Sequence, residues 1–111
     1  MQSALERRQA LFELMCERRH EKIDNLAFEF GVDRRTIRKD IALLSLSRPI
    51  YTTRGTGGGV HIVDGYDPNK FYLPERHAIT FENMKQRLKG EELDAVEYIL
   101  KKYKKPERRG R

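Results

Sequence analysis

Four cationic side chains lie close together in the stretch RRTIRKD, residues 34–40: Arg34, Arg35, Arg38 and Lys39. Arginine can donate a pair of hydrogen bonds to O6 and N7 of guanine, and both residue types bind phosphate. The neighbouring acids in the sequence are Asp33 and Asp40, which are too few to neutralise all four cations. The cluster therefore indicates a surface for double-stranded DNA rather than a solvated helix face.

This cluster is predicted to lie at the start of a helix. Asp33 is the expected N-cap, because its carboxylate can accept hydrogen bonds from the free N–H groups of the first turn. Ile37, Ile41 and Leu44 follow the spacing of one helix face, which is expected to turn inward. Asp40 lies on the same side and is expected to pair within the protein. The candidate DNA-binding residues of this helix are Arg34, Arg35, Thr36, Arg38 and Lys39.

A first helix is predicted to begin near Ala4, because Ser3 and Glu6 form an S-x-x-E capping box. Its apolar stripe includes Cys16, which is expected to be a buried small side chain rather than a reactive thiol. Cys16 is the only cysteine in the sequence. An intramolecular disulfide is therefore impossible, and a reducing compartment is consistent with the sequence.

A second, shorter helix is predicted over residues 25–30, with Asp24 as its N-cap. Gly31 follows as the residue that adopts the positive φ of a turn. This order of helix, turn and cationic helix is that of a helix-turn-helix, whose second helix enters the major groove of DNA. Ile23 is an isolated apolar residue that could form a short strand and close a small sheet.

A β-hairpin is predicted after Pro49, which ends any helix before it. Two β-prone runs, residues 50–53 and 60–63, are joined by the glycine-rich loop GTGGG. A nucleotide-binding loop needs a helix after it, whereas this loop is followed by VHIV. The hairpin is therefore interpreted as a wing whose tip lies on DNA. Its candidate contact residues are Thr53, Arg54 and Thr56.

Four segments occur in a fixed order: RRQALFELM (residues 7–15), IDNLAFEFGVD (23–33), TIRKDI (36–41) and GTGGGV (55–60). In order and spacing they resemble the DNA-binding domain of the DeoR-type bacterial repressors. The resemblance covers about residues 5–63 and implies a winged helix-turn-helix that binds double-stranded DNA and regulates transcription.

The sequence departs from the DeoR pattern in two places. The remaining chain is too short to be the sugar-phosphate-sensing domain of full-length members, so no sugar effector is implied. The wing strand is preceded by Ser47-Arg48-Pro49, where a glycine is common, so a different exit angle from the cationic helix is expected. The whole chain is most similar to small stand-alone DeoR-like regulators, which consist of a winged helix and a short helical tail.

The C-terminal part is predicted to contain a linker or arm over residues 64–77, a helical hairpin over 78–105 and a basic tail over 106–111. An apolar stripe at coiled-coil-like intervals is expected to join two copies as a homodimer; it contains Leu93, Val96, Leu100 and Tyr103. The basic residues around and beyond it are expected to add electrostatic affinity for DNA: Lys101, Lys102, Lys104, Lys105, Arg108 and Arg109. The expected fold class is thus mainly α with a small β-wing, a winged helix-turn-helix in residues 1–63 followed by a C-terminal α-helical hairpin.

Composition agrees with an anionic partner, since the formal net charge is +6 and the pI is about 9.6.

The sequence contains no apolar run of the length that spans a bilayer and no signal-peptide pattern, so a cytoplasmic protein is expected. His20, His61 and His77 are not expected to cluster, and neither a metal, a cofactor nor a catalytic group is predicted.

Two other functions compete with a sequence-specific regulator. One is a protein-interaction module that uses the winged helix or the helical hairpin, and the other is a nucleoid-type protein that binds any duplex. The arginine-rich helix favours DNA over a protein partner, and salt-sensitive retention on an oligonucleotide column would separate those two classes.

Overall fold

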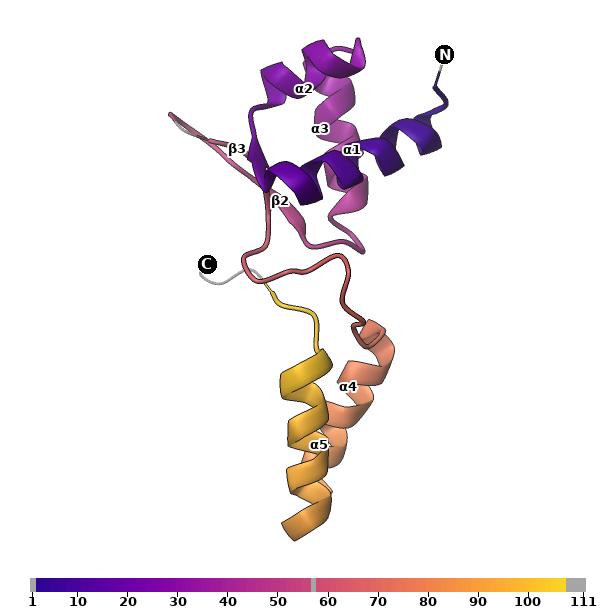
Figure 1. The fold of residues 1–111 in the computed structure, drawn as a ribbon, viewed down its shortest axis with the longest axis vertical. Coiled ribbons are helices and arrows are strands. Elements are labelled where there is room, and N and C mark those ends of the chain that lie inside the picture. Colours follow the sequence, from indigo (N-terminus) through magenta and orange to yellow (C-terminus); the bar gives the residue numbers. More distant parts are fainter. Residues whose placement is uncertain (1, 57, 108–111) are drawn as a thin grey trace. The chain divides into compact units, whose positions relative to one another are not determined.

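A computed structural model describes residues 2–56 and 58–107 of the chain. The chain divides into two compact units, the first extending to Tyr66 and the second spanning Asp67–Pro106. The elements are α1 (Ala4–Arg18), β1 (His20–Glu21), α2 (Ile23–Phe30), α3 (Arg34–Leu44), β2 (Ile50–Thr53), β3 (Gly59–Ile62), α4 (Glu75–Met84), η1 (Lys85–Arg87) and α5 (Gly90–Tyr103). The predicted fold class is confirmed: helices dominate, with one small antiparallel sheet and a C-terminal helical part (Figure 1).

The first helix begins where its capping box predicts. The Ser3 hydroxyl accepts a hydrogen bond from the Glu6 N–H at 3.1 Å, and the Glu6 carboxylate accepts one from the Ser3 N–H at 2.9 Å. Cys16 is half-buried and packs against the core rather than lying fully inside it. Burial raises the pKa of its thiol, which agrees with the predicted packing role.

The short strand beside the wing differs from its prediction. Arg19 takes a left-handed conformation, with φ at 71°, and ends α1 abruptly. The chain therefore enters the sheet at once, and His20–Glu21, not Ile23, forms β1. Ile23 is instead the first residue of α2 and packs against the core.

The second helix also begins earlier than predicted. Lys22 occupies its N-cap position without a side-chain hydrogen bond, so Asp24 lies in the first turn rather than at the cap. Gly31 has φ at 66° and closes α2, as predicted, by donating its N–H to carbonyl groups of Ala27 and Phe28. The tight turn then leads directly into α3.

The cationic helix has the predicted cap and the predicted inner face. The Asp33 carboxylate accepts the Thr36 N–H at 2.8 Å, and Ile37 and Ile41 are buried. Asp40 is 1% exposed and pairs with Arg7 of α1, as expected for an acid on the inner side. The inner face joins a core that α1, α2 and the sheet complete: Leu11, Met15, Leu26, Ile37, Ile41, Val60 and Ile62.

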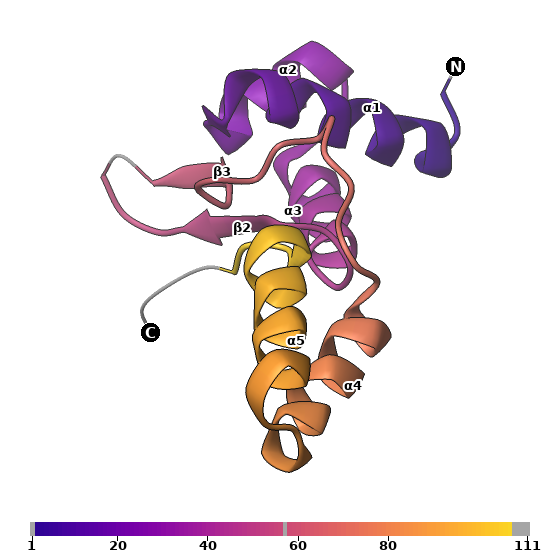
Figure 2. The ribbon, with the colours of Figure 1, turned by 60° about the horizontal axis from the view of Figure 1, so that its bottom comes forward.

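The three strands form an antiparallel sheet in the order β1-β3-β2. β2 has the predicted bounds, whereas β3 begins and ends one residue earlier than predicted. Figure 2 shows β2 and β3 running side by side away from the helices of the first unit. Ile50, Val60 and Ile62 turn one face of the sheet into the core, so Tyr51 and His61 lie on the other face.

Gly59 is required where β1 approaches β3. A Cβ atom there would lie 2.5 Å from the carbonyl oxygen of Glu21, and φ is +154°. Because the obstacle is backbone, we expect Gly59→Ala to lower the free energy of unfolding by roughly 1–3 kcal/mol in urea denaturation. Gly55→Ala is the matched control, since Gly55 also has a positive φ but meets nothing within 4 Å. Equal losses in both variants would show that the contact with β1 is unimportant.

In the second unit, α4 begins inside the stretch predicted to be a linker. Pro74 occupies the N-cap position with φ at −55°, a value suited to the start of a helix, and α4 follows at Glu75. The segment before it is anchored at the end of α5, because the Leu73 N–H donates to the Tyr103 carbonyl at 2.8 Å. α4 and α5 lie side by side (Figure 1), and Lys104 contacts Glu82 at 3.2 Å.

The stripe predicted to join two copies already has neighbours within one chain. Leu100 is 6% exposed, and Leu93, Val96 and Tyr103 are half-buried. The Tyr103 ring also meets the Phe71 ring at 5.9 Å. These side chains therefore stabilise the second unit itself.

Candidate nucleic-acid interface

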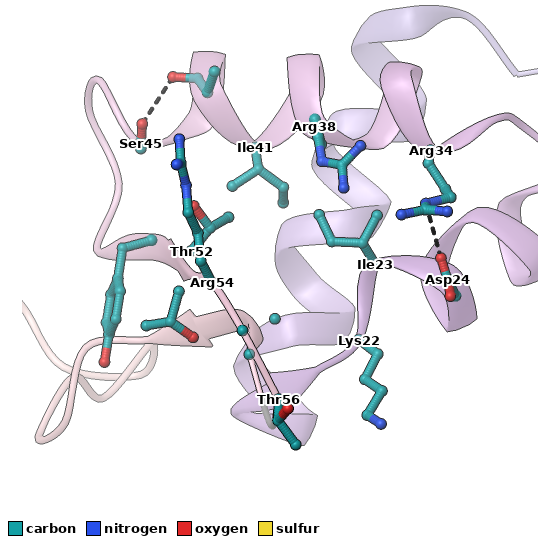
Figure 3. Close-up of a pocket in the computed structure, with 16 residues that line it drawn as sticks. Lys22, Ile23, Asp24, Arg34, Arg38, Ile41, Ser45, Thr52, Arg54 and Thr56 are labelled. Carbon is teal, nitrogen blue, oxygen red and sulfur yellow. Dashed lines mark hydrogen bonds and ion pairs between the residues drawn. The ribbon is translucent and has the colours of Figure 1, made fainter.

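A groove of about 1000 Å³ opens in the first unit between α3, the start of α2 and the wing (Figure 3). Its cations come from three separate segments: Lys22 before α2, Arg34 and Arg38 on α3, and Arg54 beyond β2. Ile41 lines its wall, where α3 passes from the groove into the core. The fold thus gathers positive charge along one concave surface, which suits a polyanion.

The predicted residues of α3 separate into two groups. Arg34 and Arg38 line the groove, and Figure 3 shows Arg34 facing Asp24 at the start of α2. Arg35 and Lys39 are exposed on α3 but do not line the groove. Thr36 is half-buried, and both its backbone and its side chain hydrogen-bond to the capping carboxylate, so its first role is to begin the helix.

All three predicted wing residues line the groove opposite α3: Thr53, Arg54 and Thr56. The Thr53 hydroxyl lies 2.7 Å from Nε2 of His61 on the neighbouring strand, whereas Arg54 and Thr56 are exposed. Gly57, in the middle of the predicted loop, lies outside the described residues. Arg108 and Arg109 of the predicted basic tail also lie outside them.

The groove contains two charged residues that the sequence did not predict for it, Lys22 and Asp24. Lys22 lies before the predicted start of α2. A lysine just ahead of a helix in this motif is the sequence signal that could have identified it as a groove residue. Asp24 is predicted as a cap, but its Oδ1 lies 3.0 Å from Nε of Arg34. The expectation that Asp33 and Asp40 are the only acids near the α3 cations is therefore wrong, because the turn at Gly31 brings a third acid to them.

The expectation that the histidines lie apart is wrong for His20 and His61. They are direct partners in the β1–β3 register, and their ring centroids are 5.0 Å apart. Tyr51 stacks on the other side of His61 at 5.1 Å. The three rings form a row across the outer sheet face. Within residues 2–56 and 58–107, no group of three or more side chains is arranged to hold a metal ion.

Asp33 makes the start of α3 sensitive to pH. Hydrogen bonds from the Thr36 side chain and backbone lower the pKa of the Asp33 carboxyl. Its contribution to stability is therefore present above the unfolded pKa, about 3.9, and is lost as pH falls through the folded pKa. We expect Asp33→Asn, which still caps, to reduce the difference between urea midpoints measured near pH 7 and near pH 3. Asp33→Ala should lower the midpoint near pH 7, and an unchanged midpoint there would exclude the cap.

Residues 6–60 match the family model described as an HTH domain. The match agrees with the helix-turn-helix geometry of this part of the chain, and it supports DNA binding and a role in the regulation of transcription. No curated protein and no solved structure matches the chain. In the part of the chain that the structure describes, no helix is long and apolar enough to cross a membrane.

Proposed function

We propose that the protein is a sequence-specific double-stranded-DNA-binding protein and a transcriptional regulator of DeoR type. The observation that carries the proposal is the convergence of Lys22, Arg34, Arg38 and Arg54 on one groove. An α-helix with its side chains is about 10–12 Å wide and fits the major groove, which is about 12 Å wide. With α3 in that groove, its exposed face meets base edges, and the wing lies against the backbone or the minor groove.

In this proposed function, residues of α3 read bases directly, and residues of the wing add electrostatic affinity. On α3, Arg34, Arg35, Arg38 and Lys39 are exposed and supply hydrogen-bond donors for guanine or phosphate. Arg54 and Thr56 of the wing supply contacts to the DNA backbone, which position the protein but carry no sequence information. Binding of this kind needs no cofactor and no catalytic group, and it places the protein in the cytoplasm with bacterial DNA.

Selection of bound fragments from random duplexes tests the proposal. A regulator should enrich one motif and bind it about 10³-fold or more tightly than a scrambled duplex of equal length at physiological salt. A nucleoid-type protein would bind both duplexes alike, with the same salt dependence. An interaction module would bind neither duplex under the conditions of the selection.

We further propose that two copies associate through the C-terminal helices and read inverted half-sites about 10 base pairs apart, or a multiple of that. The apolar stripe predicted to join two copies is buried or half-buried within the second unit. The outer face of α5 is therefore the surface that is available to a second copy. Tyr98 is 59% exposed near its middle, with Glu91 and Asp94 exposed before it and Lys101 and Lys102 after it. An antiparallel pair related by a two-fold axis would bring each acidic end to a basic end.

Charge reversal on α5 tests this dimer. Lys101→Glu with Lys102→Glu should turn a wild-type dimer into a monomer at tens of micromolar, because like charges then face each other. Glu91→Lys with Asp94→Lys should do the same. An equal mixture of the two double variants should form a heterodimer in size-exclusion chromatography with light scattering. Persistent homodimers of either variant would place the contact elsewhere, and a monomeric wild type would rule out the dimer.

A further inference from the structure

An acidic side chain lies inside the basic groove. Asp24 is the sole carboxylate among the described residues that line it, and it is 72% exposed. Its Oδ1 lies 3.0 Å from Nε of Arg34, whose side chain is 60% exposed, so the pair joins the first turn of α2 to the first turn of α3. Figure 3 shows the two side chains facing each other at one end of the groove.

A contribution to stability does not explain why Asp24 and Arg34 are paired, because an ion pair between two exposed side chains adds little to the free energy of unfolding. Asp24 also complements the dipole of α2, a modest effect that would be equally available at a position outside the groove. Within the groove the carboxylate repels phosphate, so it weakens affinity for any duplex. A residue that weakens general affinity at the binding surface is better explained by what it does to selectivity.

The geometry of the guanidinium group indicates which base Arg34 would select. Arginine has five N–H donors in a rigid planar fork, one of them on Nε. Asp24 lies against the Nε side, which leaves the two terminal nitrogens, Nη1 and Nη2, available as a pair. Such a pair matches O6 and N7 of guanine. A side chain already held in place also loses less freedom when it binds.

The other two arginines of the groove are not held in this way. Across residues 2–56 and 58–107, no carboxylate forms an ion pair with Arg38 or Arg54. Arg34 is therefore the one arginine of this groove that the free protein orients from the side, and Asp24 is the group that orients it.

We propose that Asp24 is a specificity-determining residue that holds Arg34 by Nε, so that its terminal nitrogens read one guanine, and that keeps phosphate away from this position. The inference rests on the proposed DNA-binding function. It assigns Arg34 to a base and not to the backbone, and it makes Asp24 a positioning residue with no DNA contact of its own.

The test compares the affinities of five proteins for the selected duplex, for its single-base variants and for a scrambled duplex. The proteins are the wild type, Asp24→Asn, Arg34→Lys, the double variant Asp24→Asn with Arg34→Lys, and Asp64→Asn. Asp64 is exposed and belongs to the first unit but does not line the groove, so its variant makes the same charge change outside it. Thermal unfolding confirms that each variant is folded.

We expect Asp24→Asn to bind the scrambled duplex several-fold more tightly and to lose about 5- to 100-fold of discrimination at one G·C pair. Arg34→Lys should lose discrimination at the same pair without tighter binding to the scrambled duplex. Asp24→Asn should then add no further loss of discrimination in the Arg34→Lys background, because both changes remove one interaction.

Three outcomes would overturn the inference. Equal effects of Asp24→Asn and Asp64→Asn would reduce Asp24 to a general charge effect. A lost preference for cytosine on the strand that α3 reads would make Asp24 itself a base reader, through cytosine N4. A wild-type protein with no preference among the duplexes would overturn the proposed function and this inference with it. If the wild type prefers its site, the first two outcomes overturn this inference and leave the proposed function standing.

Discussion

Replacing Arg38 and Arg54 together by alanine is expected to weaken binding to the preferred duplex by about 30-fold to 10⁴-fold. Each arginine contact with a base or phosphate contributes roughly 1–3 kcal/mol, and the two side chains line opposite sides of the groove. The slope of log affinity against log salt should also fall by roughly 0.9 for each phosphate that the variant no longer neutralises. Fluorescence anisotropy over a range of salt concentrations measures both quantities.

The control for this variant removes two positive charges outside the groove. Arg87 and Lys89 are both exposed in the second unit, and neither lines the groove. Their double alanine variant should lose much less affinity for the preferred duplex than the groove variant does. If both double variants lost affinity equally, binding would follow net charge and the groove would have no special role.

Arg7→Ala is expected to lower the free energy of unfolding by about 3–5 kcal/mol, which is a large fraction of the stability of a small domain. Nε and Nη2 of Arg7 donate to the two oxygens of Asp40 at 2.6 and 3.0 Å, and Asp40 is 1% exposed. The hydrogen bond to Asp40 raises the pKa of Arg7. Without Arg7, a buried carboxylate loses its main partner. Urea unfolding near neutral pH measures the loss.

Two further variants show whether the effect comes from the buried charge. Arg8 reaches Asp40 with one contact, at 3.4 Å, so Arg8→Ala should have a much smaller effect than Arg7→Ala. The double variant Arg7→Met with Asp40→Leu should recover most of the stability, because it removes the charge together with its partner. A double variant as unstable as Arg7→Ala alone would show that packing of the Arg7 side chain, not the pair, is important.

The sequence by itself determined the features that depend on residues close together in the chain. The S-x-x-E box begins α1, Asp33 caps α3, and Gly31 closes α2, because each makes hydrogen bonds within a few residues. The inner face of α3 followed from its spacing, which also predicted that Asp40 is turned inward. The family match over residues 6–60 has the same origin, since the local pattern is what identifies a helix-turn-helix.

Local patterns were insufficient to locate the first residue of two helices, α2 and α4. Asp24 has the right side chain for a cap, yet α2 begins at Ile23, because β1 ends at Glu21 and the next residues must turn onto the core. The linker predicted over residues 64–77 likewise overlaps a helix, because Pro74 occupies the N-cap position of α4. For α2, the packing of Ile23 against the core moved the start of the helix.

Only the tertiary structure decided which side chains share the groove. Arg34 and Arg38 line the groove, whereas Arg35 on the same helix does not, because the packing of α3 selects which edge of its exposed face borders the groove. The contact of Asp24 with Arg34 joins residues on different helices, as the ring contact between His20 and His61 joins different strands. Such contacts depend on how the chain folds back on itself, and no spacing along the sequence contains that information.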